Sequence, residues 1–301
     1  MITSREPKPI CLGGTVWAFS NETAKNHFDY LFIDEAGQVS VPNLIAISQS
    51  CKNIILMGDQ MQLSQPIQGS HPGKSGQSIL DYLLEERATI PTDVGIFLPV
   101  SYRMNPNICK LLSDQVYEGK LESATNTQQH VLTNLESDII KQDSGICYIP
   151  VNHEGNYQGS DEEINQIRRI TQHLLHTEYW PDPQNGEKRF ITWDDILFVA
   201  PYNYQVNKLQ KALGKVAKVG SVDKFQGQEA PIVILSMCSS EAPESSQGIN
   251  FLFSKNRLNV AISRAQALTI IVASPRLSLA SGNNLKQMEL INFYHKCINV
   301  V

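Results

Sequence analysis

The sequence lacks any apolar run long enough to cross a membrane, and its first nine residues contain no apolar core typical of a signal peptide. Its six cysteines include no close pair, so neither a zinc knuckle nor a disulfide framework is indicated. Positive charge is not in excess either: 25 Lys and Arg face 30 Asp and Glu, which excludes a generally basic nucleic-acid coat but not a local basic groove. We expect a cytoplasmic globular protein with reduced thiols and no membrane partner, long enough at 301 residues for two domains.

The most informative stretch is Tyr30–Gln38, in which four apolar residues are followed directly by Asp34 and Glu35. A parallel sheet covered on both faces buries its strands and presents polar groups at their carboxyl ends. An acid pair at such a strand end suits a magnesium nucleotide, because Asp34 can hold the metal through its water shell and Glu35 can take a proton from an attacking water. The alternative is a solvated loop that begins with two acids.

A second apolar run, residues 53–57, also ends in a polar cluster, Gly58–Pro66, so two strands should deliver polar groups to one edge. The later Gly73-Lys74-Ser75 resembles the end of a phosphate-binding loop. That motif would need glycine at position 68, where Gln68 stands, and a strand leading into it. We therefore reject it.

Strands alternate with helices along the rest of the chain, which predicts two α/β domains with parallel sheets, at 1–92 and 96–301, joined by a linker at 88–95. The predicted strands are 10–19 (broken by a glycine pair that forms a turn or approaches a phosphate or sugar), 145–151, 196–200 and 269–273. Residues 96–99 are a short apolar run, and 219–228 and 232–237 bracket another dense motif. The predicted helices are 41–50, 79–87, one that starts with a capping box of Ser160 and Glu163, one through Leu213, and 256–266. Residues 120–144 are expected to be a surface loop or helix, and 180–188 a loop. His173 and His176 are expected to be surface histidines.

Five segments taken together resemble the motifs of superfamily 1 helicases, in the 5′-to-3′ branch related to the RNA-decay helicases. They are Asp34–Gln38 (motif II), Gly58–Pro66 (motif III), Ser101–Met104 (motif IV), Ser221–Glu229 (motif V) and Asn259–Ala265 (motif VI). Each alone is a weak signal. Their order and approximate spacing across most of the chain are what carry the resemblance.

The resemblance implies two RecA-like domains that hydrolyse ATP in the cleft between them, with Asp34 on Mg²⁺ and Glu35 polarising the water. Gln62 would contact the γ-phosphate, and Arg103 and Arg264 would neutralise charge on the transferred phosphoryl group. The alternative for each arginine is a surface ion pair. The remaining nucleotide-binding positions implied by the motifs are Asp59, Gly227 and Glu229.

The resemblance also implies a single-stranded DNA or RNA partner, held mainly by its sugar-phosphate backbone across the opposite face of both domains. Tyr202 could stack on a base, or it could pack behind its strand end. The candidate contacts by motif position are Thr15, Pro201, Tyr202, Ser221, Val222 and Lys224.

A relative should carry a phosphate-binding loop well before motif II, and none of the 33 residues that precede Asp34 forms one. We therefore expect the first domain to be incomplete and the chain to be the carboxyl-terminal part of a longer helicase, whose other part could include a nuclease domain. Two alternatives stay open. One is a nucleic-acid-binding remnant without ATPase activity, and the other is a nuclease-linked P-loop ATPase that does not unwind its substrate.

Overall fold

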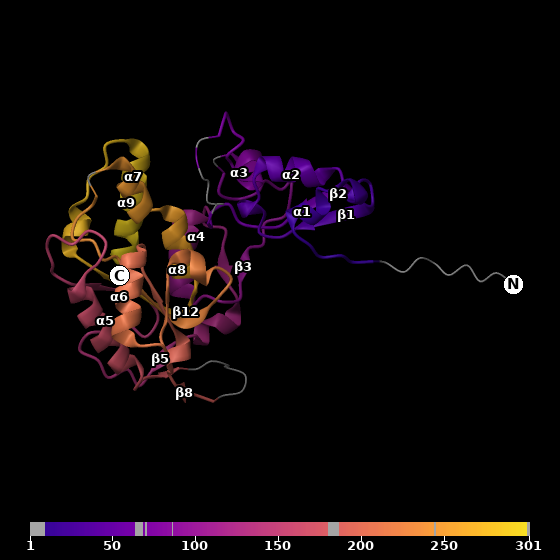
Figure 1. The fold of residues 1–301 in the computed structure, drawn as a ribbon. Helices are drawn as coiled ribbons and strands as arrows, with labels where there is room; N and C mark the ends of the chain where they lie inside the picture. The colour runs from indigo at the N-terminus through magenta and orange to yellow at the C-terminus, as the bar shows by residue number, and fades with distance from the viewer. Residues whose placement is uncertain are drawn as a thin grey trace. The chain divides into compact units, whose positions relative to one another are not determined.

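A computed structural model describes residues 10–63, 69, 71–85, 87–179, 187–243 and 245–299. It divides into two compact units (Figure 1). Unit 1 takes its residues from Met1–Gln60 and Ser64–Arg87, and unit 2 takes its residues from Met61–Leu63 and Ala88–Val301. Pro66 of motif III and most of the predicted loop 180–188 lie outside the described residues.

Unit 1 contains two parallel strands, β1 (Phe28–Ile33) and β2 (Cys51–Leu56), in a register that pairs Ile33 with Leu56. The predictions of these two strands and of a helix at 41–50 are confirmed, and Pro42 lies in the first turn of that helix. The helices are α1 (Val16–Phe19), α2 (Val41–Ser48) and α3 (Ile79–Leu84), and two 3₁₀ turns are η1 (Glu22–Ala24) and η2 (Ala36–Gln38).

The predicted strand at 10–19 is wrong, because residues 16–19 form helix α1 with Thr15 as its N-cap. Val16 and Phe19 are three residues apart, so one helical turn brings both against the apolar cluster of unit 1. A strand would have placed them on opposite faces.

The expectation that β1 is buried on both faces is also wrong for the described part of unit 1. Leu31 and Ile33 are each 7% exposed and belong to its apolar cluster, whereas Tyr30 and Phe32 are 59% and 61% exposed. Side chains alternate along a strand, so the cluster covers only one face of the two-stranded sheet.

Unit 2 is built on a parallel sheet of five strands in the order β10-β9-β11-β12-β6. The strands are β6 (Gly145–Pro150), β9 (Ile196–Val199), β10 (Lys218–Gly220), β11 (Ala230–Ser236) and β12 (Ala265–Ala273). All four neighbouring pairs run parallel, which confirms the predicted sheet. The near-continuous burial of β9, β11 and β12 is typical of strands covered on both faces.

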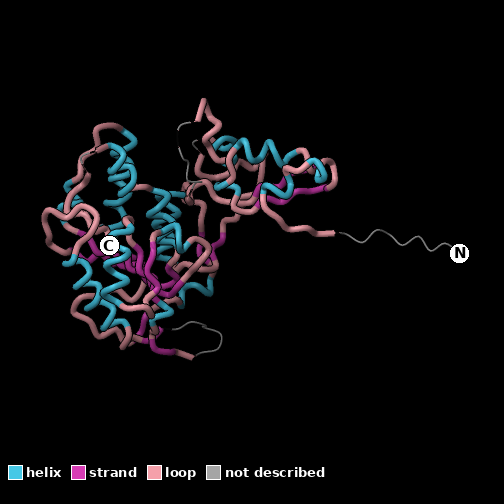
Figure 2. The backbone as a smooth tube through the Cα atoms, viewed as in Figure 1, coloured by secondary structure: helices cyan, strands magenta, loops and turns pink. Residues whose placement is uncertain are grey.

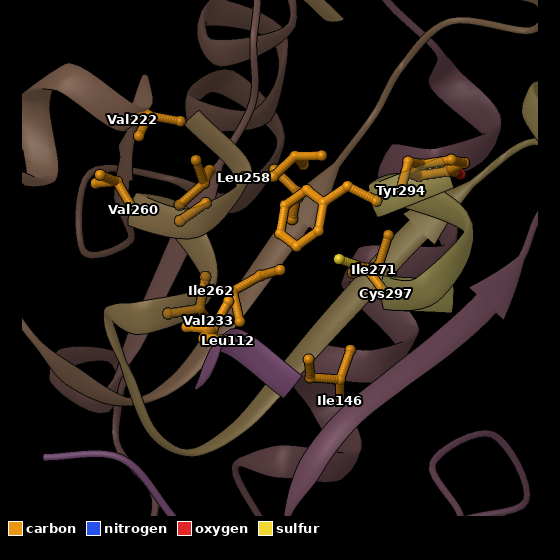
Figure 3. Packing of buried hydrophobic residues seen from close by; sticks show 14 of the residues in the cluster. Leu112, Ile146, Val222, Val233, Leu258, Val260, Ile262, Ile271, Tyr294 and Cys297 are labelled. Atoms are coloured by element: carbon orange, nitrogen blue, oxygen red, sulfur yellow. The ribbon is translucent and has the colours of Figure 1, made fainter. Parts of the chain in front are cut away.

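Helices pack on both faces of this sheet (Figure 2). One apolar cluster joins the sheet to α4, α7, α8 and α9, and Figure 3 shows part of it, including Val222, Leu258, Val260 and Tyr294. The other cluster joins the sheet to α5 and α6. The helices are α4 (Pro106–Val116), α5 (Asp161–Leu174), α6 (Asn203–Leu213), α7 (Ser246–Leu252), α8 (Lys255–Ser263) and α9 (Leu285–Ile298).

Short strands and turns complete unit 2. They are β3 (Val100–Ser101), β4 (Glu122–Ser123), β5 (Leu132–Thr133), β7 (Glu178–Tyr179), β8 (Arg189–Phe190), η3 (Thr125–Gln129), η4 (Trp193–Asp195), η5 (Val222–Phe225) and η6 (Pro275–Leu279). The apolar run at 96–99 is not a strand: Ile96 and Leu98 are exposed, and pairing begins only at Val100. The expectation for 120–144 is wrong in part, because the segment supplies β4 and β5 and buries Ile140.

The capping box predicted at the start of α5 is only half formed. The Ser160 side chain accepts a hydrogen bond from the Glu163 backbone N–H at 3.1 Å, as predicted. The Glu163 carboxylate does not return to Ser160, because it lies in a buried polar network, and the Ser160 N–H donates to Gln205 instead. Among the described residues, no helix is long and apolar enough to span a membrane.

Candidate functional site

The acid pair of unit 1 lies where the two parallel strands end side by side. The Met57 N–H donates to the Ile33 carbonyl at 2.8 Å, and the Ala36 N–H donates to the Met57 carbonyl at 2.8 Å. Asp34 and Glu35 therefore leave β1 at the same edge at which Gly58 and Asp59 leave β2. The prediction that two strands deliver polar residues to one edge is confirmed.

Two glycines let motifs II and III approach each other this closely. A Cβ atom at Gly37 would lie 2.8 Å from the Asp59 carbonyl oxygen, and one at Gly58 would lie 2.7 Å from the Ala36 nitrogen. Both distances are shorter than a carbon atom tolerates. Any side chain at either position would force the two motifs apart, so the acid edge depends on both glycines.

Glu35 has a left-handed backbone, with φ of 51°, and its N–H donates to Asp34 Oδ1 at 2.9 Å. A non-glycine residue in this region is strained, and such strain persists where the surroundings impose it, often at functional sites. The two neighbouring acids lie in the turn between these elements: Asp34 directly follows β1, and Glu35 is the N-cap of η2.

The donor set of this edge fits a magnesium nucleotide better than a metal held by protein alone. Among the described residues, no group of three or more His, Cys, Asp or Glu side chains could hold a metal ion. Mg²⁺ is usually bound by one or two carboxylates, with water and substrate phosphates as its other ligands. Asp34 is placed to be such a carboxylate.

In unit 2, Arg103 and Glu229 meet at the amino edge of the five-stranded sheet, just before β11 and β12 begin. Arg103 Nε donates to Glu229 Oε2 at 2.5 Å, and its Nη1 donates to the Ser263 carbonyl at 3.2 Å. Gln266 Nε2 donates to the other Glu229 oxygen at 3.0 Å. Burial opposes ionisation, but Arg103, Gln266 and the charge of Arg264 together hold the pKa of Glu229 below its usual range.

Arg264 is at the same edge but is only 3% exposed. Its Nε donates to the Val260 carbonyl at 3.1 Å and its Nη1 to the Gln228 carbonyl at 3.3 Å. The guanidinium therefore holds the turn that carries Gly227, Gln228 and Glu229. Gly227 has φ of 75°, a left-handed conformation that favours glycine.

Motif III continues into unit 2, where two asparagines of α8 hold its backbone. Asn256 Nδ2 donates to the Gln62 carbonyl at 2.6 Å, and Asn259 Nδ2 donates to the Met61 carbonyl at 3.0 Å and to the Tyr117 hydroxyl at 2.8 Å. Helix α8 ends at Arg264, its C-cap. The sequence analysis missed these asparagines, although Asn259 opens motif VI.

The predicted nucleic-acid residues of unit 2 lie at the opposite, carboxyl edge of the sheet. Pro201 and Tyr202 follow β9, and Ser221 follows β10; the Ala200 N–H donates to the Gly220 carbonyl at 3.2 Å, so the two strand ends are adjacent. Motif V then runs along the sheet from this edge to Glu229 at the amino edge.

The Tyr202 ring is half-buried against Phe251, with ring centroids 5.2 Å apart. The Arg257 guanidinium carbon lies 4.5 Å from the centre of the Phe251 ring, and Arg257 Nη1 donates to Asp223 Oδ2 at 3.2 Å. This stack joins the end of β9 to motif V through α7 and α8. Burial raises the pKa of the Tyr202 hydroxyl.

The other three predicted nucleic-acid contacts differ in which of their groups a ligand could reach. Val222 is 4% exposed and packs in the core (Figure 3), so only its backbone could meet a ligand. Lys224 is exposed, with Nζ donating to the Val219 carbonyl at 2.7 Å. Thr15 is an exposed residue of unit 1.

Comparison with known proteins finds family models and relatives that match most of the chain. A family model described as an AAA domain matches residues 76–276, and a second of the same description matches 14–68. The Schizosaccharomyces pombe ATP-dependent helicase upf1 is 28% identical over 275 residues, which are 87% of this chain and 28% of that protein. The Saccharomyces cerevisiae ATP-dependent helicase NAM7 is 32% identical over 280 residues, which are 89% of this chain and 27% of that protein. A solved complex of the arterivirus nonstructural protein 10 helicase with DNA matches at 15% identity and a TM-score of 0.39, over 82% of this chain and 39% of that one.

The parallel sheets with polar strand ends, and the family models that cover most of the chain, define RecA-like domains of the P-loop NTPase class. The chain belongs to the AAA-domain family of superfamily 1 helicases, and within it to the Upf1-like type. It spans less than a third of the length of the upf1 and NAM7 helicases named above.

Proposed function

We propose that this chain is the motor part of an ATP-dependent helicase that moves along single-stranded DNA or RNA. The observation that carries the proposal is the division of unit 2 into two edges. The charged pair Arg103–Glu229 lies at one edge, Tyr202 and Ser221 lie at the other, and motif V connects them. Through motif V, a structural change at a bound nucleotide would be transmitted to a bound nucleic-acid strand. Units 1 and 2 would be RecA-like domains 1 and 2.

In the proposed reaction Asp34 holds Mg²⁺, which supplies charge neutralisation at the phosphates, and Glu35 accepts the proton of the attacking water. Gln62 would contact the γ-phosphate, and Asp59, Gly227 and Glu229 would line the nucleotide site. Arg103, about 30% exposed in its side chain, would stabilise the transferred phosphoryl group.

Arg264 needs a different account, because it is buried and donates to the Val260 and Gln228 carbonyls. In this conformation it positions the turn of Gly227 and Glu229. Because the residue is only 3% exposed, direct contact with a phosphate would require the guanidinium to become more accessible than it is in this conformation.

The single-stranded nucleic acid would contact Thr15 of unit 1. In unit 2 it would contact Pro201, Tyr202, Ser221, the backbone of Val222, and Lys224. These are mostly small or backbone groups, which suit sugar and phosphate rather than base edges. They do not distinguish DNA from RNA, and the cytoplasmic location stays a prediction.

We also propose that a further polypeptide segment of the same protein, carrying the phosphate-binding loop, completes unit 1. The exposed aromatic face of β1, with Tyr30 and Phe32, supports this, because parallel sheets are normally covered on both faces. A nuclease domain beyond that segment is one version of the proposal.

The test is ATP hydrolysis by the full-length protein, with and without single-stranded nucleic acid. Strand-stimulated hydrolysis should be abolished by Glu35→Gln and kept by Glu22→Gln, an exposed acid of η1. Hydrolysis that survives Glu35→Gln contradicts the proposal. Strand binding without any hydrolysis would indicate a binding remnant, and hydrolysis without strand separation would indicate a P-loop ATPase of another kind.

A further inference from the structure

Two exposed tyrosines lie on the carboxyl edge of unit 2, outside the helicase motifs. Tyr157 is 78% exposed in the loop that joins β6 to α5, and Tyr204 is 59% exposed in the first turn of α6, two residues after Tyr202. Exposed aromatic rings beside a proposed strand-binding edge are candidates for stacking on bases.

The loop that carries Tyr157 is fixed on both sides of this residue. On one side, the Asn156 N–H donates to Ser240 Oγ at 2.9 Å and the Ser240 N–H donates to the Asn156 carbonyl at 2.8 Å. On the other, the Ser160 N–H donates to Gln205 Oε1 at 3.0 Å and Gln205 Nε2 donates to the Ser160 carbonyl at 3.2 Å. Tyr157 is therefore held between the end of β11 and the start of α6.

The same contacts bring Tyr204 close to this loop. Gln205 follows Tyr204 directly, and a Cβ atom at Gly159 would lie 2.7 Å from Tyr204 Cδ1. The Tyr204 ring thus rests on Gly159, two residues beyond Tyr157. Glycine at 159 leaves room for the Tyr204 ring, so Tyr204 lies against the loop that carries Tyr157.

A buried pair, His153 and Glu163, holds these loops together, and both side chains are 0% exposed. His153 contacts Ser240 Oγ at 2.7 Å and Glu163 Oε1 at 3.0 Å. Glu163 Oε2 accepts from Ser236 Oγ at 2.6 Å and from the Cys238 N–H at 2.9 Å. Cys238 has a left-handed backbone, with φ of 53°, so the carboxylate stabilises a strained turn.

The order Ser240, His153, Glu163 is that of a serine hydrolase relay, but Ser240 is only 2% exposed and lies beneath Asn156. A substrate could not reach it, so the network serves to position loops. Burial raises the pKa of Glu163, because a charged carboxylate is less favourable away from water. Rigid loops that present exposed aromatic rings reduce the ordering cost of binding a ligand.

We propose that Tyr157 and Tyr204 bind unpaired bases of a single strand, on a surface positioned by Glu163 and His153. This proposal rests on the function proposed above and extends its strand contacts beyond Tyr202. The charges nearby favour base stacking over phosphate contact. Lys208 Nζ lies 5.4 Å from the centre of the Tyr204 ring, but it is paired with Asp161 at 2.8 Å, and Glu162 accepts from Asn156 Nδ2 at 2.9 Å. Acidic side chains therefore already neutralise the lysine beside these rings.

The experiment measures affinity for a labelled single-stranded homopolymer by fluorescence anisotropy over a series of salt concentrations. Tyr157→Leu and Tyr204→Leu keep apolar bulk but remove the aromatic ring, and each should weaken binding about fivefold or more. Tyr157→Phe and Tyr204→Phe should bind like the wild type. The salt dependence should have the same slope in every variant, because no phosphate contact is lost.

Two matched control variants test whether binding depends on where the aromatic ring and the carboxylate lie. They remove an exposed ring and a carboxylate at other positions. Phe190→Leu removes an aromatic ring that is 60% exposed on β8, and it should leave binding unchanged. Glu163→Gln should weaken binding and speed hydrogen exchange in 153–160 and 238–240 without affecting exchange at Ala230. Glu289→Gln, which removes an exposed carboxylate of α9, should do neither.

The outcomes distinguish this proposal from the proposed helicase function on which it rests. A wild-type protein that binds no strand at low salt overturns both. A wild type that binds, with leucine variants that bind equally well, overturns only the tyrosine surface. A weakened leucine variant with a shallower salt slope also overturns it, because the lost contact would then be to phosphate.

Discussion

The guanidinium of Arg103 and the carboxylate of Glu229, 126 residues apart in the chain, meet with Nε and Oε2 at 2.5 Å. The pair joins motif IV to the end of motif V at the amino edge of the unit 2 sheet. The arginine that the motifs assign to a phosphate thus already has a carboxylate partner. A nucleotide would have to compete with Glu229 for it or share it.

The first prediction concerns pH. Because the pKa of Glu229 in the folded protein is below its usual value, the pair stabilises unit 2 above the ordinary pKa of Glu, about 4.3, and this stabilisation is lost as pH falls through the folded-state pKa. Glu229→Gln should lower the free energy of unfolding at pH 7 by less than about 1 kcal/mol, since both side chains are partly exposed. The difference from wild type should vanish in acid, as measured by urea unfolding across pH.

The matched control is Asp114→Asn, which removes the carboxylate of the exposed pair Lys110–Asp114 on α4. It should change stability by less than Glu229→Gln does, because that pair is more open to water. A Glu229→Gln deficit that is equal at pH 7 and in acid would show that the charge of Glu229 does not stabilise the fold.

The second prediction concerns the contact between motifs II and III. Gly37→Ala places a methyl group 2.8 Å from the Asp59 carbonyl oxygen, so the backbone must move. We expect unit 1 to lose about 1–3 kcal/mol of stability. Gly13→Ala is the control, because nothing lies within 4 Å of its added methyl group. Hydrogen exchange of β1 and β2 is the measurement, and equal protection in the two variants would refute the steric argument.

The third prediction concerns the attachment of motif III to α8. Asn259→Ala removes the donor to the Met61 carbonyl and to the Tyr117 hydroxyl at a fully buried position. The cost should be about 1–3 kcal/mol, because a fully buried side chain loses two hydrogen bonds. Asn250→Ala, on the exposed part of α7, should change the free energy of unfolding by about 0.5 kcal/mol or less. Thermal unfolding of the two variants compares them directly, and equal melting temperatures would contradict the proposed attachment.

The elements that could be predicted from the sequence are those whose pattern is local. Runs such as Ile196–Ala200 and the apolar residues before Asp34 identified strands of parallel sheets, because such strands are continuous in apolar residues. The two glycines that permit the close approach of motifs II and III are visible in the sequence as parts of those motifs. Their contact could not be predicted, because it depends on the register of two strands that are separate in the chain.

The features that could not be predicted depend on partners distant in the chain. Glu163 has the spacing of a capping box, but the buried His153 and Ser236 draw its carboxylate away from the helix end. The exposure of Tyr30 and Tyr157 depends on which other parts of the protein pack against them. The local spacing of apolar residues in the sequence does not contain that information. Arg264 likewise follows the motif, yet its burial is set by the Gln228 carbonyl across the turn.

The central claim is that the acids of unit 1 and the guanidinium of unit 2 act on one phosphoryl transfer. A double-mutant cycle in single-turnover ATP hydrolysis by the full-length protein tests it, with Glu35→Gln, Arg103→Ala and the two combined. Arg103→Ala should slow hydrolysis by at least about 10³-fold, the loss typical of a transition-state arginine, and Glu35→Gln should slow it strongly as well. The double variant should be little slower than the slower single variant. Two losses that multiply in the double variant would show that the residues act independently and would contradict the account.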